Sequence, residues 1–198
     1  MPGSGEIWFA TSNGHKFEEA RFALRPFGIK LGRLWEKGTE IQSNDVREIA
    51  RRAALEAFGR VKKPLFVEDS GLFVASLGGF PGPYASFVNR TLGPASIITL
   101  MEGVRRRNAE FISAVAFCND PSAARVFVGR LKGEVAVTMR GSNGFGFDPI
   151  FIPTGRVRTM AEMSLKEKAE ISHRSLALRA LGAWLNSNLG SGQSQGDN

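Results

Sequence analysis

Apolar residues recur with two different periods along the chain and divide its first half into alternating strands and helices. Short apolar runs predict buried strands at Ile7–Ala10 and 65–67, and alternation of apolar and polar residues predicts a half-exposed strand at 29–35. Apolar residues at helical spacing predict helices at 15–24 and 45–59. In the predicted strand at 65–67, the apolar run stops before an acidic, glycine-containing segment, which indicates a turn there.

The second half of the chain has strands first and helices afterwards. The predicted elements are a short helix at 95–101 and a β-hairpin or meander from 111–117 and 126–139. They are followed by a helix opened by Ser164, with Glu167 completing its capping box, and by a helix at 175–185. The glycine- and proline-rich segments 77–84 and 140–144 are predicted loops. This order of elements predicts an α/β fold with a mixed β-sheet. We expect one domain over 1–186 and a disordered tail over 187–198, which is rich in Gly, Ser, Asn and Gln.

Composition narrows the class of protein. The 198 residues, 42% of them hydrophobic, are enough for one sizeable core. The single cysteine, Cys118, excludes a disulfide within the chain, and the sequence offers no membrane span and no secretory signal near Met1, so we expect a cytoplasmic protein. A net charge of +7 favours polyanionic ligands such as nucleotides, but the basic runs are dispersed, so no stable nucleic-acid partner is expected.

Two segments offer chemistry suited to phosphates. The turn from Thr11 to Lys16 lies between a predicted strand and a predicted helix, where backbone N–H groups and the helix dipole bind anions. It lacks the spacing of a Walker sequence, and a simple helix cap is the alternative. The carboxylates of Glu40, Glu68 and Asp69 could hold Mg²⁺ while one of them activates water, if they share a cleft.

Two further segments are suited to a nucleobase. The glycines around Phe145 and Phe147 allow close approach of a ligand, and either ring could stack on a base, although one of the two is expected to belong to the core. The side chains of Lys168, His173 and Arg174 are donors suited to the acceptor atoms of a purine. Taken alone, Ser172-His173-Arg174 is also typical of a helix cap with a charged neighbour.

The order of these motifs resembles that of the inosine/xanthosine triphosphate pyrophosphatase family. The resemblance runs from Ile7 to about Leu185 and rests on six motifs in register. They are Thr11-x-Asn13-x-x-Lys16, Val67-Glu68-Asp69-Ser70-Gly71, Gly78-Gly79-Phe80-Pro81-Gly82, Gly144-Phe145-Gly146-Phe147-Asp148-Pro149-Ile150-Phe151, Ala161-Glu162-Met163 and Lys168-x-x-x-Ser172-His173-Arg174.

This resemblance implies an elongated mixed sheet flanked by helices, with two lobes and a central cleft. It also implies Mg²⁺-dependent hydrolysis of ITP, XTP and dITP between the α- and β-phosphates, and a homodimer. Asp69 and Lys16 would be catalytic, and Glu40, Glu68 and Asp69 would bind the metal. The implied substrate-binding residues are Thr11, Ser12, Asn13, Lys16, Ser70, Gly71, Phe145, Gly146, Phe147, Asp148, Lys168, His173 and Arg174.

One position departs from the family pattern. Many members carry a Lys in the helix before the Glu-Asp strand, and here that region reads Arg51-Arg52-Ala53. Arg51 or Arg52 could take its place on the phosphates, although Arg and Lys are not interchangeable. Two other functions remain open, a non-catalytic nucleotide- or RNA-binding protein on the same scaffold and a pyrophosphatase for modified pyrimidine nucleotides.

Overall fold

The computed structural model describes residues 6–35, 39 and 41–189 of the chain. Its strands are β1 (Ile7–Ala10), β2 (Leu31–Leu34), β3 (Leu65–Val74), β4 (Pro81–Gly82), β5 (Asn108–Asp120), β6 (Ala123–Val135) and β7 (Phe151–Pro153). Its α-helices are α1 (Gly14–Leu24), α2 (Val46–Val61), α3 (Ala85–Thr91), α4 (Ala95–Leu100), α5 (Leu165–Ile171) and α6 (His173–Leu189). Short 3-10 helices are η1 (Arg25–Phe27), η2 (Ala75–Leu77), η3 (Asp148–Ile150) and η4 (Met160–Glu162).

The described strands form one mixed sheet in the order β2-β1-β3-β5-β6-β7, with β4 paired to β3. β2, β1 and β3 run parallel, and β5, β6 and β7 continue the sheet antiparallel. The predicted mixed-sheet α/β fold is therefore confirmed.

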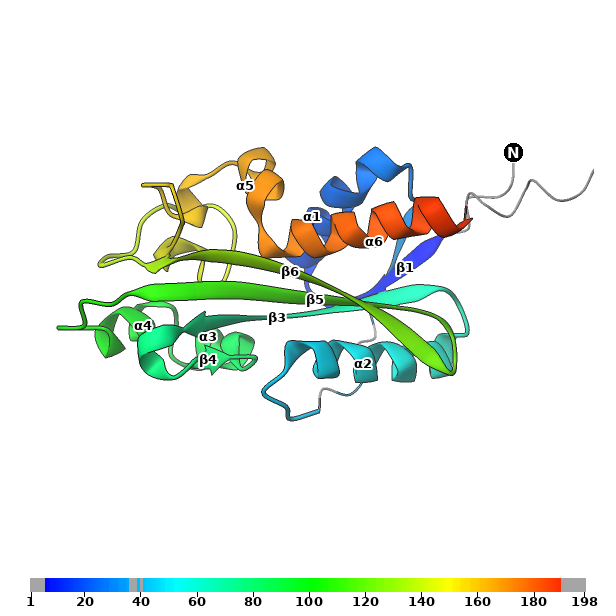
Figure 1. Cartoon of the computed structure of the whole chain (residues 1–198), viewed down its shortest axis with the longest axis horizontal. Coiled ribbons are helices and arrows are strands. Elements are labelled where there is room, and N and C mark those ends of the chain that lie inside the picture. The colour runs from blue at the N-terminus through cyan, green and yellow to red at the C-terminus, as the bar shows by residue number, and fades with distance from the viewer. Residues whose placement is uncertain (1–5, 36–38, 40, 190–198) are drawn as a thin grey trace, which may run out of the picture.

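Helices cover both faces of the sheet at the end that holds β1 (Figure 1). α1 and α6 lie on one face, where the rings of Phe9 and Phe66 stack with centroids 4.4 Å apart, and α2 lies on the other face against Leu65 and Val67. The long strands β3, β5 and β6 continue past this end into a second lobe with α3 and α4, whose core includes Leu72. The sheet is thus shared by two lobes, as the resemblance implies.

One edge of β3 is open between the two lobes. β1 pairs with β3 at Leu65 and Phe66, and β4 pairs with it at Leu72 and Phe73. Among the described residues, no strand pairs with this edge of β3 over 67–71. Ligands of open α/β sheets bind beyond the ends of parallel strands, so we expect a ligand site at the end of β1 next to this gap.

The acidic segment lies inside β3 and not in a turn after it. The prediction of a strand ending at 67 was wrong, since β3 continues to Val74 and Gly71 is a strand residue. Gly71 is there because β4 approaches closely: a Cβ at this position would lie 2.3 Å from the carbonyl oxygen of Gly82. A glycine that makes room for a distant backbone looks the same in the sequence as a glycine that makes a turn.

Local signals predicted several other elements. Asn13 is the N-cap of α1, Ser164 and Glu167 form the capping box of α5, and β5 and β6 form the predicted hairpin. The short elements α3, β4 and β7 were not predicted. α6 extends to Leu189, so the boundary of the predicted tail at 187 was wrong, and 190–198 lie outside the described residues.

In the part of the chain that the structure describes, no helix is both long and apolar enough to cross a membrane.

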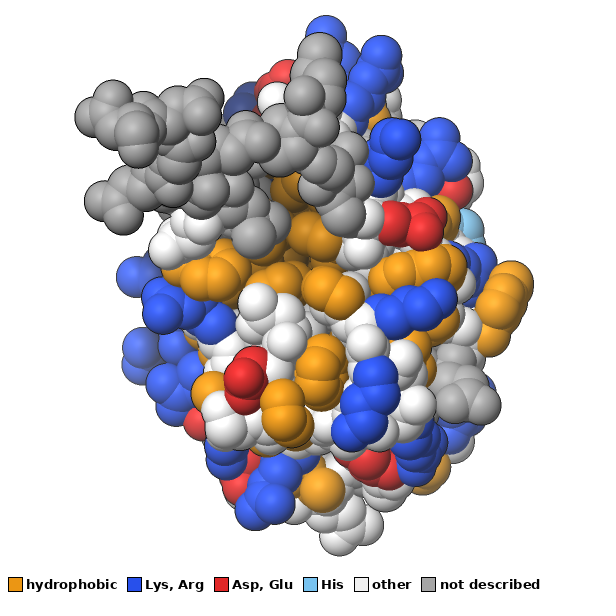
Figure 2. Space-filling view, turned by 90° about the vertical axis from the view of Figure 1, so that its right-hand side faces the viewer, with side chains coloured by type: hydrophobic (Ala, Val, Ile, Leu, Met, Phe, Trp, Pro, Cys, Tyr) orange, Lys and Arg blue, Asp and Glu red, His pale blue; other side chains and the backbone are white. Residues whose placement is uncertain are grey.

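Lys and Arg side chains on the end of the molecule shown in Figure 2 are interrupted by hydrophobic and other polar side chains. On this face, the positive charge is spread over the surface.

Candidate active site

A cleft of about 560 Å³ lies beside the open edge of β3. One wall comes from the end of β1, α1, β3, the loop before η3, and α6; the other comes from α3 and the residues before it. The lining residues are Ser12, Asn13, Lys16, Asp69, Ser70, Gly71, Pro83, Ala85, Ser86, Asn89, Arg90, Phe111, Phe145, Gly146, Phe147, Asp148, His173 and Arg174. Most of the predicted site residues therefore meet in one cleft, while Glu40 lies outside the described residues.

The turn after β1 is held in place by its own side chains and by Arg33. Asn13 Oδ1 accepts a hydrogen bond from the backbone N–H of Lys16 at 3.1 Å, and the Asn13 N–H donates to Thr11 Oγ1 at 3.1 Å. The guanidinium of Arg33, on β2, donates to the carbonyl oxygens of Thr11 at 3.1 Å and of Ser12 at 2.7 Å. These bonds fix the N-terminus of α1 at the cleft, where its dipole favours an anion. Sequence reasoning missed Arg33, which carries no local motif.

Glu68 is a buried carboxylate with three partners. Its Oε2 lies 2.8 Å from Lys16 Nζ, and its Oε1 lies 3.1 Å from Arg174 Nε and accepts a hydrogen bond from Ser113 Oγ at 2.6 Å. Burial alone would raise the pKa of Glu68, but the charges of Arg174 and Lys16 hold it well below its usual value. Glu68 is therefore ionised, and it positions two of the cations of the cleft.

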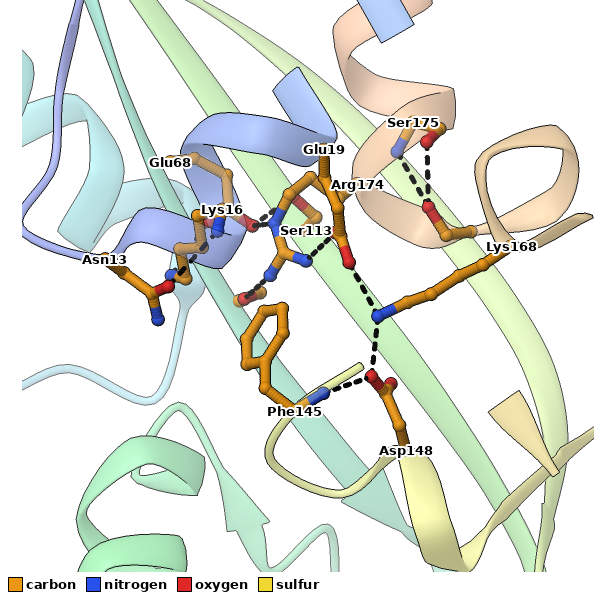
Figure 3. A network of polar contacts seen from close by, with 12 residues as sticks. Asn13, Lys16, Glu19, Glu68, Ser113, Phe145, Asp148, Lys168, Arg174 and Ser175 are labelled. Atoms are coloured by element: carbon orange, nitrogen blue, oxygen red, sulfur yellow. Dashed lines mark hydrogen bonds and ion pairs between the residues drawn. The ribbon is translucent and has the colours of Figure 1, made fainter. Parts of the chain in front are cut away.

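A second buried carboxylate, Glu19 on α1, joins the two cations that were predicted to read the base. Glu19 Oε2 accepts from Arg174 at 2.5 Å, and Glu19 Oε1 lies 2.6 Å from Lys168 Nζ (Figure 3). Burial would raise its pKa, but the charges of Arg174 and Lys168 lower it to about 2. Sequence reasoning missed Glu19. The available signal was its position one helical turn after Lys16, which puts both side chains on the same side of α1.

Asp148 is the last residue in the series of buried ion pairs that runs from Arg174 through Glu19 and Lys168. Its Oδ2 accepts hydrogen bonds from Lys168 Nζ at 2.6 Å and from the backbone N–H of Phe145 at 2.8 Å. Burial raises the pKa of Asp148, and the nearby charge of Lys168 opposes this only in part. Gly144 has a φ of 75°, and a Cβ there would lie 2.1 Å from Asp148 Oδ2. Glycine at 144 therefore lets the loop close over Asp148 and present Phe145 to the cleft.

The ring of Phe145 is surrounded by polar groups. Lys168 Nζ lies 4.8 Å and Arg174 Cζ 5.3 Å from its centroid, and the ring of His15 stacks on it at 5.2 Å. Phe147 is 4% exposed and belongs to the core of the second lobe, although it also lines the cleft. Phe145 is thus the better placed of the two rings to face a ligand. The contact with His15 was not predicted.

His173 is a neutral, buried imidazole that lines the cleft. Its ring stacks on Phe111 with centroids 4.6 Å apart, and burial, together with the charge of Arg174, keeps its pKa well below the usual value. Its Nδ1 has no hydrogen-bond partner among the described residues. α6 can bring His173 this close because β6 carries Gly129, where a Cβ would lie 1.9 Å from the His173 carbonyl oxygen. A buried polar atom without a partner is costly, so it indicates a ligand.

Glu68 and Asp69 lie on different faces of the sheet. Successive side chains of a strand point in opposite directions; Glu68 contacts α1 and α6, whereas Asp69 is opposite Ala114 in the cluster under α2. Asp69 nevertheless lines the cleft, because the sheet edge beside it is open. The described residues contain no group of three carboxylate, His or Cys side chains that could hold a metal, and Glu40 falls outside them. The carboxylate of Asp69 is a donor that suits a hard cation shared with phosphate oxygens.

Three of the predicted site residues that the structure describes do not line the cleft. Thr11, Glu68 and Lys168 are buried behind it. Arg51 and Arg52 are exposed on α2, and neither lines the cleft.

Comparison with known proteins gives consistent matches over nearly the whole chain. The model of the Ham1 family matches residues 7–184. The chain is 45% identical over 181 residues to a dITP/XTP pyrophosphatase of Thermococcus kodakarensis, covering 91% of this chain and 97% of that protein. It is 47% identical over 175 residues to a dITP/XTP pyrophosphatase of Ignicoccus hospitalis, covering 88% and 93%. The structure of a HAM1 protein from Coxiella burnetii superposes with a TM-score of 0.82 at 31% identity, covering 92% of this chain and 98% of that one.

Proposed function

This chain belongs to the Ham1 family, and from that membership we propose that it hydrolyses dITP, ITP and XTP to the nucleoside monophosphate and pyrophosphate. The observation that carries the proposal is the content of the cleft. A helix N-terminus with Lys16, the carboxylate of Asp69, and the base-binding candidates Phe145 and His173 all line one cavity. A protein that only binds nucleotides would have no need of the Asp69 carboxylate.

Hydrolysis between the α- and β-phosphates requires an activated water and a place for negative charge. We assign Asp69 as the general base that takes a proton from water, and Lys16 with the N-terminus of α1 as the group that binds the phosphates. Asp69 would hold Mg²⁺, which supplies charge neutralisation at the phosphates when bound. Glu68, another predicted metal ligand, does not fit this role, since its oxygens are engaged by Lys16, Ser113 and Arg174 and it does not line the cleft.

Selection of the base follows from the buried donors. A 6-oxo purine offers an acceptor oxygen to the N–H groups of His173 and Arg174, whereas adenine presents a donor amine there. An amine would leave buried donors without partners, and such a loss reduces binding strongly. Phe145 would stack on the base.

We propose further that the protein is a homodimer that acts in the cytoplasm. Exposed apolar side chains near and on α3 and α4 support an interface, with Tyr84, Leu92 and Leu100 being 44%, 63% and 51% exposed. Light scattering that gave a mass near 21.5 kDa would contradict the dimer.

The reaction is tested with purified protein, Mg²⁺, and separate incubations with ITP, XTP, dITP, GTP, ATP and dUTP. We expect monophosphate and pyrophosphate from the first three and little from ATP. Asp69→Asn should lose turnover while it still binds inosine monophosphate. Binding without hydrolysis by the unaltered protein would favour the nucleotide-binding alternative, and preference for dUTP would favour the pyrimidine alternative.

A further inference from the structure

The cations on the α1 and α6 side of the cleft are already paired with carboxylates. Lys16 lies 2.8 Å from Glu68, and Arg174 contacts both Glu68 and Glu19. Lys168, behind them, lies 2.6 Å from Glu19 and from Asp148. With Asp69 added, this wall carries no excess of positive charge. A nucleoside triphosphate carries several negative charges, so it needs a cation that is not already neutralised.

Arg90 meets this requirement from the opposite wall. It lies in the last turn of α3 and lines the cleft together with Ser86 and Asn89. Its guanidinium lies 5.8 Å from the centroid of the Phe87 ring, and it forms no ion pair with any described residue. Among the cations that line the cleft, Lys16 and Arg174 have carboxylate partners, whereas Arg90 has none in the part of the chain that the structure describes.

We propose that Arg90 binds the polyphosphate chain of the substrate and the pyrophosphate product, from the wall opposite Lys16. This inference rests on the proposed function, and it names a residue outside the predicted site. The planar guanidinium can donate two parallel hydrogen bonds to phosphate oxygens. Arg90 would also supply a phosphate-binding cation in place of the Lys that many family members carry in the helix before the Glu-Asp strand. Arg51 and Arg52 cannot do so, because they are exposed on α2 and do not line the cleft.

Substrate bound in this way would be held from both walls. The nucleobase and the sugar-linked phosphate would lie against the α1 and α6 side, while the outer phosphates would bridge to α3. Loss of Arg90 should therefore weaken ligands in proportion to their outer phosphates and spare the monophosphate. A role in folding alone would not separate these ligands.

The test compares Arg90→Ala and Arg90→Lys with the unaltered protein in calorimetric titrations with inorganic pyrophosphate and, separately, inosine monophosphate. For Arg90→Ala we expect the Kd for pyrophosphate to rise about 10-fold or more, as for loss of a hydrogen bond to a charged group. The Kd for inosine monophosphate should change less than about 2-fold, and Arg90→Lys should retain part of the pyrophosphate binding. Arg51→Ala, an exposed arginine on α2, is the matched control and should bind both ligands normally.

Hydrolysis assays with XTP, ITP and dITP distinguish a failure of the proposed function from a failure of the inference on Arg90. If the unaltered protein hydrolyses no non-standard purine triphosphate, the proposed function fails. If it does, but Arg90→Ala binds pyrophosphate as the unaltered protein does, the inference on Arg90 is wrong and the reaction stands. Equal weakening by Arg51→Ala, or equal loss of both ligands in Arg90→Ala, would also overturn the inference.

Discussion

Replacement of Glu19 by Gln should destabilise the protein because two buried cations each lose one of the two carboxylates that balance them. Glu19 contacts Arg174 and Lys168, and all three side chains are nearly inaccessible to solvent. Its pKa falls from 4.5 to about 2 on folding; at about 1.4 kcal/mol per pKa unit this corresponds to about 3 kcal/mol in the free energy of unfolding. The value lies at the lower end of the cost of breaking a buried ion pair, about 3–5 kcal/mol.

Urea unfolding at pH 7 measures this loss. With a slope of about 2 kcal/mol per molar for a domain of this size, the midpoint for Glu19→Gln should fall by about 1.5 M. Because the folded-state pKa is depressed, the stabilisation is present above about pH 4.5 and is lost as the pH falls toward about 2. The difference between the two proteins should therefore shrink on acidification. Glu18→Gln, at the neighbouring exposed position that pairs with Arg21, should change stability little. A midpoint for Glu19→Gln equal to that of Glu18→Gln would refute the reasoning.

Three other outcomes are expected. Gly129→Ala should cost about 1–3 kcal/mol in the free energy of unfolding, because its Cβ would lie 1.9 Å from the His173 carbonyl oxygen; Gly59→Ala, where no atom lies within 4 Å, should not destabilise. The pKa of His173 is lowered in the fold, so the unfolded chain takes up the proton first; stability should fall below about pH 6.5, and urea unfolding of His173→Phe should lack that part of the pH dependence, by up to about 1.4 kcal/mol per pH unit. Chelation of divalent metal should stop pyrophosphate release and added Mg²⁺ should restore it, whereas full turnover in excess chelator would contradict the metal proposal.

The sequence predicted features that depend on neighbours in the chain and missed those that depend on distant ones. The capping box at Ser164 is local and was predicted, and the cap of α1 is Asn13, one of the two candidates that its local sequence offered beside Ser12. Glu19 and Arg174 are 155 residues apart, so neither the motif around Lys16 nor the one around His173 could show their contact. The turn predicted at Gly71 is wrong because the close approach of β4, which requires a glycine there, leaves no local trace in the sequence.

The set of motifs in the sequence predicted most of the residues that line the cleft, because residues that share one site are all required even when they lie far apart in the chain. It could not show which of these residues touch the cavity and which stand behind it. Lys168 illustrates the limit: its donor atom was read as a base contact, and in the fold it lies between Glu19 and Asp148. The sequence likewise gave no reason to look at Arg90, which belongs to a helix that was not predicted.

Glu68 and Asp69 have different surroundings because they are consecutive residues of a strand. Consecutive side chains point to opposite faces, so Glu68 is surrounded by α1 and α6, where Lys16, Ser113 and Arg174 occupy its oxygens. A carboxylate so engaged is held ionised and serves to fix the cations around it. Asp69 can reach the cleft from the other face only because β1 ends before it and β4 begins after it. The gap in the sheet edge is therefore what allows one strand to supply both a buried counter-ion and a carboxylate that faces the cleft.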